Sequence, residues 1–194
     1  MWKFVKSALE KNTWLDCQNN HQLCFWGRSN VGKSSLLNSL VNQKISYVSK
    51  QPGRTQFINY FQEDSRYIVD LPGYGFAKLS KEKIEKMNYW IELFLLNDHS
   101  PKTIFLLIDS RIGIGKIDIE KINFLKHTNW QIHLIYTKID KLNQKEKSAL
   151  IKKHNEFLKD DVLTQNTQYF LVSSTKNIGI DDLISYINEN VYIG

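Results

Sequence analysis

One octet near the N-terminus constrains the fold of this chain more than any other sequence feature. It reads Gly27-Arg28-Ser29-Asn30-Val31-Gly32-Lys33-Ser34 and matches the pattern G-x-x-x-x-G-K-S. An apolar run over residues 23–26 precedes it and a helical pattern over residues 34–41 follows, so a chance match is disfavoured. The glycines let backbone N–H groups close around phosphate oxygens, and the helix N-terminus adds a positive dipole end. Lys33 is expected to reach the β- and γ-phosphates, and the Ser34 hydroxyl to ligate magnesium.

Short apolar runs alternate with longer helical patterns along the rest of the chain. The runs that predict strands cover residues 23–26, 67–71, 104–109, 132–137 and 169–173, with a weaker one around residues 59–61. The helical patterns cover residues 34–41, 80–96, 118–127, 143–158 and 180–187. We therefore expect an α/β fold of the P-loop NTPase type, with a six-stranded, mostly parallel sheet flanked by helices on both faces. Ligands of such sheets bind beyond the carboxyl ends of the strands.

Length and composition predict a single domain. The chain has 194 residues without a repeat or a Pro/Gly-rich linker, which favours one domain over residues 1–194 with a short N-terminal extension over about residues 1–20. Lys3, Lys6 and Glu10 interrupt the N-terminus too early for a signal peptide. No apolar run approaches the ~20 residues of a membrane helix, so a cytoplasmic location is expected.

A second motif distinguishes guanine from adenine. Thr137-Lys138-Ile139-Asp140 follows the predicted strand over residues 132–137, which places it on the ligand side of the sheet. A carboxylate at Asp140 can accept hydrogen bonds from guanine N1–H and the exocyclic amine, neither of which adenine offers. The aliphatic stem of Lys138 can cover the plane of the base. An ordinary charged loop is the alternative, and the order and position of the motif argue against it.

Two further segments fit a site that senses the γ-phosphate. Asp70-Leu71-Pro72-Gly73 ends a predicted strand, so Asp70 can hold a magnesium-bound water and the Gly73 N–H can meet the γ-phosphate. The same residues favour a β-turn, and both interpretations can hold. Thr55 lies between the first helix and the next strand, where its hydroxyl can ligate magnesium. Ser173-Ser174-Thr175 follows the last strand, where its backbone can contact the guanine carbonyl, with Ser174 best placed.

These elements, in this order, resemble the TRAFAC class of small GTPases. Three stretches, residues 27–36, 52–56 and 70–78, are similar to the EngB family, also called YihA or YsxC. Asp109-Ser110-Arg111 leading to Asp118 also fits this family, whereas Gln51 stands where threonine is expected.

The resemblance implies a monomeric GTPase with magnesium and slow hydrolysis, which binds GTP and GDP. It would act as a switch in assembly of the large ribosomal subunit and its rRNA, and so be required for growth and cell division. No stable membrane association is expected.

Catalysis is the least determined part of the site. Tyr74 stands where Ras-like GTPases place the glutamine that orients water, which predicts slow intrinsic turnover. Lys33 and Thr55 are candidate stabilisers of the transition state, and no residue stands out as the general base. Two roles stay open for Asn30. Its carboxamide oxygen can ligate potassium beside the phosphates, as the resemblance implies, or the side chain can brace the loop by hydrogen bonds.

The predicted ligands form two sets. The residues expected to contact guanine nucleotide are Gly27, Arg28, Ser29, Asn30, Val31, Gly32, Lys33, Ser34, Ser35, Gly53, Arg54, Thr55, Asp70, Gly73, Thr137, Lys138, Asp140, Ser173, Ser174 and Thr175. The predicted metal ligands are Ser34 and Thr55 for magnesium, Asp70 for magnesium through water, and Asn30 for potassium.

The charge pattern leaves the partner open. Net charge is +6, which suits a polyanion. Basic residues crowd both predicted switch segments, which suggests an RNA-facing surface: Lys44, Lys50, Arg54, Lys78, Lys81, Lys83 and Lys86. A P-loop nucleotide kinase is one alternative, but the arginines are too dispersed to form a lid. A membrane-surface GTPase is the other, and the sequence contains neither a lipidation motif nor a basic amphipathic anchor.

Overall fold

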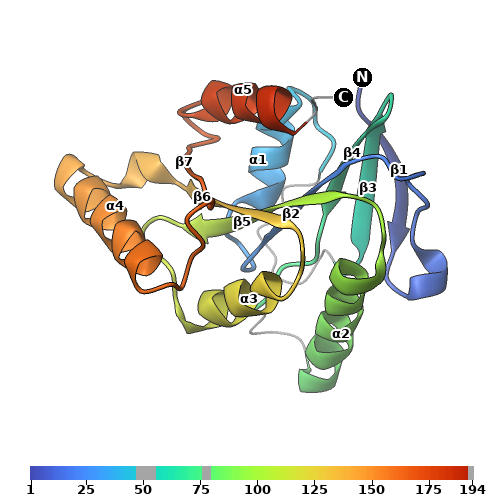
Figure 1. Cartoon of the computed structure of the whole chain (residues 1–194). Helices are drawn as coiled ribbons and strands as arrows, with labels where there is room; N and C mark the ends of the chain where they lie inside the picture. The colour runs from blue at the N-terminus through green and yellow to red at the C-terminus, as the bar shows by residue number, and fades with distance from the viewer. Residues whose placement is uncertain (47–55, 76–79, 192–194) are drawn as a thin grey trace.

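A seven-stranded sheet organises the part of the chain that the structure describes (Figure 1). This computed structural model describes residues 1–46, 56–75 and 80–191. The strands are β1 (Lys3–Ala8), β2 (Gln22–Gly27), β3 (Ile58–Glu63), β4 (Arg66–Asp70), β5 (Lys102–Asp109), β6 (Gln131–Thr137) and β7 (Tyr169–Leu171). Their order is β1-β3-β4-β2-β5-β6-β7. The β1–β3 and β3–β4 pairs are antiparallel and the other four pairs are parallel, which confirms the mostly parallel sheet.

The helices alternate with these strands. They are α1 (Lys33–Leu40), α2 (Lys81–Asn97), α3 (Lys116–Lys126), α4 (Gln144–Lys159) and α5 (Ile180–Asn190), with two short 3-10 helices, η1 (Lys11–Thr13) and η2 (Ile139–Lys141). The Ser80 hydroxyl accepts a hydrogen bond from the Lys83 N–H and so begins α2, as its residue type at this position predicts. No helix among the described residues is both long and apolar enough to span a bilayer.

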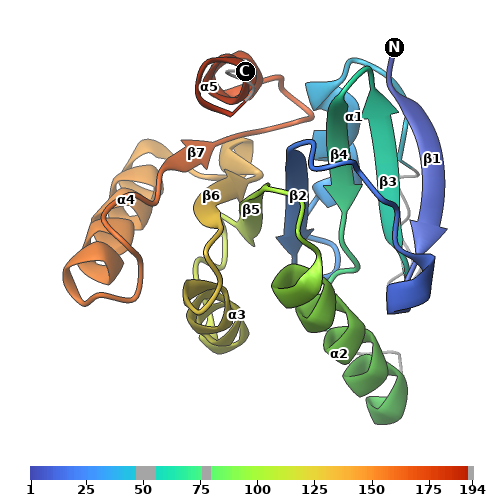
Figure 2. The ribbon, with the colours of Figure 1, turned by 45° about the vertical axis from the view of Figure 1, so that its right-hand side comes forward.

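Two hydrophobic cores lie on the two faces of the sheet, and β2 contributes to both. Because successive side chains alternate across a strand, Leu23 and Phe25 join the core under α1 and α5. Cys24 and Trp26 join the core under α2 and α3. Figures 1 and 2 show α1 and α5 on one side of the sheet and α2 and α3 on the other. Burial on both faces explains why the central strands read as continuous apolar runs.

The sheet has seven strands, so the prediction of six was wrong by one strand, β1. This strand lies within the segment predicted as an N-terminal extension and pairs with β3 alone, at the edge of the sheet. Its side chains are mostly exposed, and its register shifts between Phe4 and Lys6. An exposed, irregular edge strand needs no clear apolar alternation, which is why the sequence pattern did not reveal it.

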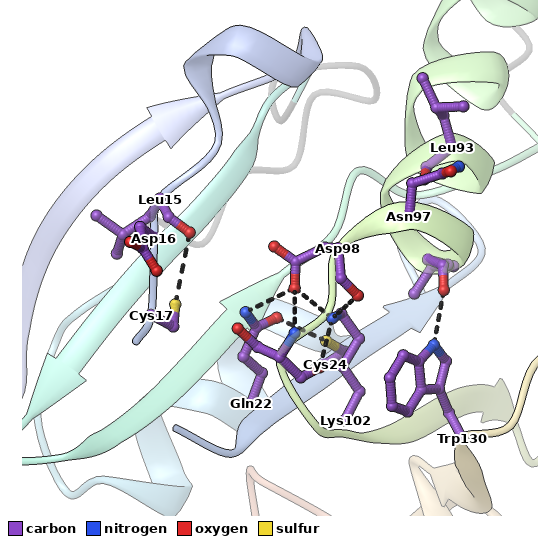
Figure 3. Close-up of polar contacts among 12 residues, drawn as sticks. Leu15, Asp16, Cys17, Gln22, Cys24, Leu93, Asn97, Asp98, Lys102 and Trp130 are labelled. Carbon is purple, nitrogen blue, oxygen red and sulfur yellow. Dashed lines mark hydrogen bonds and ion pairs between the residues drawn. The ribbon is translucent and has the colours of Figure 1, made fainter. Parts of the chain in front are cut away.

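A buried polar cluster occupies the amino ends of β2 and β5, at the edge of the sheet opposite the predicted site (Figure 3). Lys102 is fully buried and forms an ion pair with Asp98. Its ammonium also donates to the carbonyls of Asp98, at 3.0 Å, and Ser100, at 2.7 Å, just beyond the C-terminal end of α2. The Gln22 amide donates to the Asp98 carboxylate at 3.2 Å. These contacts fix the C-terminal end of α2 to the sheet, since a buried charge is tolerated only when it is paired.

The buried His133 of β6 makes stability depend on pH. Its Nδ1 accepts a hydrogen bond from the Gln168 N–H at 3.1 Å, so the proton lies on Nε2, 2.9 Å from the Tyr186 hydroxyl. Burial lowers the pKa of His133 from 6.5 to about 4. Between these values the unfolded chain binds more protons than the folded chain, so stability falls as pH falls.

We expect protonation of His133 in the unfolded chain to lower the free energy of unfolding by up to about 3 kcal/mol between pH 6.5 and pH 4. Urea unfolding at stepped pH measures this. His133→Gln should flatten the profile, whereas His99→Gln, which replaces an exposed imidazole, should leave it unchanged. A His133→Gln profile parallel to that of the parent chain would contradict the assignment.

Candidate functional site

The predicted site lies where four neighbouring parallel strands end. Gly27 ends β2, Asp70 ends β4, Asp109 ends β5 and Thr137 ends β6. These strands are adjacent in the order β4-β2-β5-β6, so their carboxyl ends meet at one edge of the sheet. The loops that follow them carry the phosphate loop, the Asp70–Gly73 segment and the guanine motif.

The phosphate loop joins β2 to α1 in a conformation that exposes the helix N-terminus. Gly32 has a φ of +104°, a left-handed conformation that glycine adopts at little cost, and it caps α1. Lys33 is the first residue of α1, and Ser34 and Ser35 follow in its first turn. Backbone N–H groups in a first helical turn have no acceptor within the helix, so they can bind an anion.

Lys33 and Asp70 form a buried ion pair at the centre of the site. Burial lowers the pKa of Lys33, while the adjacent carboxylate favours the charged ammonium. Asp70 Oδ1 is the partner of Lys33, and Oδ2 is buried with no hydrogen-bond partner among the described residues. A nucleotide phosphate can take the place of Asp70 beside Lys33, which would free the whole carboxylate.

The donors present fit a magnesium ion. The unpartnered Asp70 Oδ2 and the Ser34 hydroxyl in the first turn of α1 are oxygen donors of the kind that Mg²⁺ prefers. Within residues 1–46, 56–75 and 80–191, no three His, Cys, Asp or Glu side chains cluster as metal ligands. Few protein ligands are typical of Mg²⁺ held between a protein and substrate phosphates.

The guanine motif also supports the phosphate loop. The Thr137 hydroxyl donates to the Val31 carbonyl at 2.7 Å, and the Lys138 ammonium donates to the Asn30 carbonyl at 2.8 Å. Lys138 also donates to Asp109 Oδ2 at 2.8 Å. Thr137 and Lys138, which the sequence predicts to contact the guanine base, therefore also position the phosphate loop. Their partners in that loop lie 106 and 108 residues away along the chain.

Asp109 is a functional residue whose role the sequence analysis missed. Burial raises its pKa, but hydrogen bonds from Arg111 and Lys138 outweigh this effect and lower the pKa to about 2. The carboxylate thus stays charged and holds Lys138 in place. The sequence did carry a signal for this role, because Asp109 is the last residue of a predicted strand, as Thr137 is. In the structure the two residues are paired in neighbouring strands.

Asp140 is held by the segment after β7. Its Oδ1 accepts a hydrogen bond from the Ser173 hydroxyl at 2.6 Å, and Lys141 lies 3.2 Å from Oδ2. The hydrogen bond from Ser173 is the main cause that lowers the pKa of Asp140. The Ser173 N–H donates to the Ile178 carbonyl, so it is not free for the guanine carbonyl. Ser173 therefore positions Asp140. The backbone contact with the guanine carbonyl stays a prediction for Ser174, which is half-buried, and for Thr175, which is exposed.

The segment after Asp70 lies directly against the phosphate loop. The Tyr74 N–H donates to the Gly27 carbonyl at 3.1 Å, and the Tyr74 carbonyl accepts from the Ser29 N–H at 2.9 Å. A Cβ on Gly73 would lie 3.2 Å from both the Gly27 oxygen and the Ser29 nitrogen, so glycine alone fits comfortably. Arg28 lies beside the same segment, since its Nε is 3.8 Å from the Cβ position of Gly75.

Three of the predicted ligands fall in a segment that the structure does not describe. Gly53, Arg54 and Thr55 lie outside the described residues. Asn30 is exposed with a φ of 64°, which asparagine tolerates better than most residues, and its carbonyl accepts the hydrogen bond from Lys138.

Known proteins share this fold and sequence. A family model described as a 50S ribosome-binding GTPase matches residues 22–138. Over 192 residues the chain is 72% identical to a probable GTP-binding protein EngB of Mycoplasmopsis agalactiae, with 99% of each chain covered.

Two solved structures resemble this chain. A crystal structure of a probable GTP-binding protein engB has a TM-score of 0.67 at 24% identity and covers 87% of this chain and 97% of its own. A crystal structure of Era with MgGDPNP and nucleotides 1506–1542 of 16S ribosomal RNA has a TM-score of 0.66 at 27% identity, covering 87% and 56%.

The matched residues 22–138 contain the phosphate loop, the Asp70–Gly73 segment and the start of the guanine motif, and the full-length identity extends past Asp140 and Ser173. The geometry of the site and these similarities lead to one family. The chain belongs to the EngB family of GTP-binding proteins and is a GTPase.

Proposed function

We propose that this GTPase is a slow molecular switch that binds the large ribosomal subunit, or a precursor of it, in its GTP-bound state. The observation that carries the proposal is the contact between the phosphate loop and the backbone of Tyr74, which follows Gly73 directly. A γ-phosphate on Lys33 would meet this segment, whereas GDP would not reach it. The switch would be a monomer with one domain over residues 1–194. It would act in the cytoplasm and would be required for growth and division.

Slow hydrolysis follows from the position of Tyr74. The side chain is buried, with 1% of its surface exposed, and its hydroxyl donates a hydrogen bond to Asp118 in the core. It therefore lacks the amide with which glutamine orients an attacking water in Ras, and its hydroxyl is already bound to Asp118. Magnesium would be held by Ser34 and Thr55 and, through water, by Asp70.

The surface that we propose for rRNA is formed by three lysines at the N-terminal end of α2, which alternate with Glu82 and Glu85. Lys81, Lys83 and Lys86 are exposed and follow the Gly73 segment closely along the chain. Lys44 is exposed beyond the C-terminal end of α1, and Lys50, Arg54 and Lys78 lie outside the described residues. The family description as a 50S ribosome-binding GTPase supports this choice of partner.

Binding to the large subunit should depend on both nucleotide and salt. We expect co-sedimentation to be stronger with a non-hydrolysable GTP analogue than with GDP, and to weaken as salt rises because RNA contacts release counterions. Replacing Lys81, Lys83 and Lys86 by glutamate should weaken binding at least about tenfold. The same change at Lys145, Lys152 and Lys159 of α4 is the charge-matched control. Equal binding with both nucleotides, or binding to anionic liposomes instead, would contradict the proposal.

A potassium ion beside the phosphates is part of the proposed mechanism. The carboxamide of Asn30 would ligate it, so that the cation neutralises charge that builds up during hydrolysis. Single-turnover hydrolysis should be roughly tenfold or more faster in potassium than in sodium at equal ionic strength. Asn30→Ala should remove this difference while GDP still binds. Equal rates for the parent chain in both salts would leave catalysis to a group supplied by the partner.

A further inference from the structure

The hydroxyl of Tyr74 is tied to α3 inside the core. It donates a hydrogen bond of 2.8 Å to Asp118 Oδ1, across 44 residues of sequence. Tyr74 is 1% exposed and Asp118 is 0% exposed, so water does not compete for this contact. A hydrogen bond to a buried carboxylate is stronger than one between neutral groups.

Asp118 is itself held rigidly. Its Oδ2 accepts a hydrogen bond of 2.8 Å from the N–H of Gly115, the N-cap residue of α3. One carboxylate thus begins α3 and anchors Tyr74. Burial, followed by the charge of Asp118, raises the pKa of the Tyr74 hydroxyl, which therefore stays protonated as a donor.

A second anchor lies on the other side of Gly73. The Trp26 indole N–H donates to the Pro72 carbonyl at 3.0 Å, and its ring meets the Tyr74 ring edge-on at 5.3 Å between centroids. Trp26 is fully buried, and the Lys121 ammonium lies 5.2 Å from its ring centre. Pro72 and Tyr74, the two neighbours of Gly73, are therefore both fixed by side chains of the core.

We propose that Tyr74 is a positioning residue, whose hydroxyl acts through Asp118 to hold the Gly73 peptide beside the phosphate loop before GTP arrives. This inference rests on the proposed function, in which the Gly73 N–H contacts the γ-phosphate. Preorganisation of that peptide lowers the ordering cost of GTP binding. GDP has no γ-phosphate and gains nothing from it, so Tyr74 sets the preference for GTP over GDP.

Tyr74→Phe tests the inference, because it removes only the hydroxyl. The measurement is the dissociation constant for GDP and for a non-hydrolysable GTP analogue, with magnesium, from fluorescent nucleotides. We expect affinity for the analogue to fall about tenfold while affinity for GDP stays near that of the parent. Tyr60→Phe is the control. It removes a hydroxyl from an equally buried tyrosine whose ring meets Phe94 of α2, and it should leave the ratio of the two affinities unchanged.

Asp118→Ala closes a double-mutant cycle. The variant carrying both changes should bind the analogue no more weakly than the weaker single variant, because both changes break one hydrogen bond. Additive losses would overturn the direct link between the two residues. An equal loss of GDP and analogue affinity in Tyr74→Phe would make Tyr74 a residue of folding alone and would also overturn the inference.

The same measurements separate this inference from the function beneath it. If the parent chain binds neither GDP nor the GTP analogue, both the proposed function and this inference are wrong. A parent chain that binds both, with Tyr74→Phe keeping the parent's ratio of affinities, would remove the inference and leave the switch intact.

Discussion

Asp140→Asn is expected to weaken GTP binding by roughly 10²- to 10⁴-fold and to make xanthosine triphosphate the better ligand. The carboxylate accepts two hydrogen bonds from guanine, and each charged hydrogen bond is worth ~1.5–3 kcal/mol. An asparagine presents an amide N–H, which clashes with the guanine donors and pairs with the extra carbonyl of xanthine. Isothermal titration calorimetry with GTP and with xanthosine triphosphate measures this change in preference.

Ser173→Ala is the matched control for this change. It removes the hydrogen bond that holds Asp140 but keeps the carboxylate, so GTP binding should weaken without any gain for the xanthine nucleotide. If Asp140→Asn binds GTP as tightly as the parent chain, then Asp140 does not read the base.

Lys33→Met is expected to destabilise the chain without ligand by about 3–5 kcal/mol and to abolish tight nucleotide binding. Removal of the ammonium leaves Asp70 buried without a partner, and breaking one half of a buried ion pair costs about this much. Methionine keeps the apolar length of the side chain, so the effect reports charge more than packing. Urea unfolding in the absence of nucleotide gives the change in stability.

The double variant Lys33→Met, Asp70→Leu separates stability from function. Replacing both charges by apolar groups should recover most of the lost stability, because no buried charge remains unpaired. Nucleotide binding should stay absent, since the phosphates have lost Lys33 and magnesium has lost Asp70. A Lys33→Met chain as stable as the parent would show that the ion pair is not formed in solution.

Local signals were enough to predict where the site lies. The phosphate loop, Asp70 and the guanine motif each follow a buried strand, and parallel strands bring such residues together at one edge whatever the details of the fold. The helix predicted over residues 80–96 likewise begins within one residue of the N-terminus of α2, where Ser80 is a favourable N-cap residue type.

Contacts between distant side chains were beyond the sequence patterns. Nothing in the spacing of Tyr74 and Asp118 indicates that a hydroxyl and a carboxylate meet in the core. The hydrogen bond from Ser173 to Asp140 likewise depends on how the segment after β7 turns back toward the site. Such pairs depend on how whole helices and strands pack against one another. The spacing of apolar residues predicts each element but not this packing.

The cluster around Lys102 makes the C-terminal end of α2 the fixed end of that helix. Its C-terminal end is fastened to the sheet by hydrogen bonds to the carbonyls of Asp98 and Ser100, whereas its N-terminal end begins after Ser80 with exposed lysines. The helix has 17 residues, so it is about 25 Å long. A tilt of about 10° around the fixed end would move Lys81 by about 4 Å, so any tilt of α2 that the cluster allows would displace the lysines of its N-terminal end most.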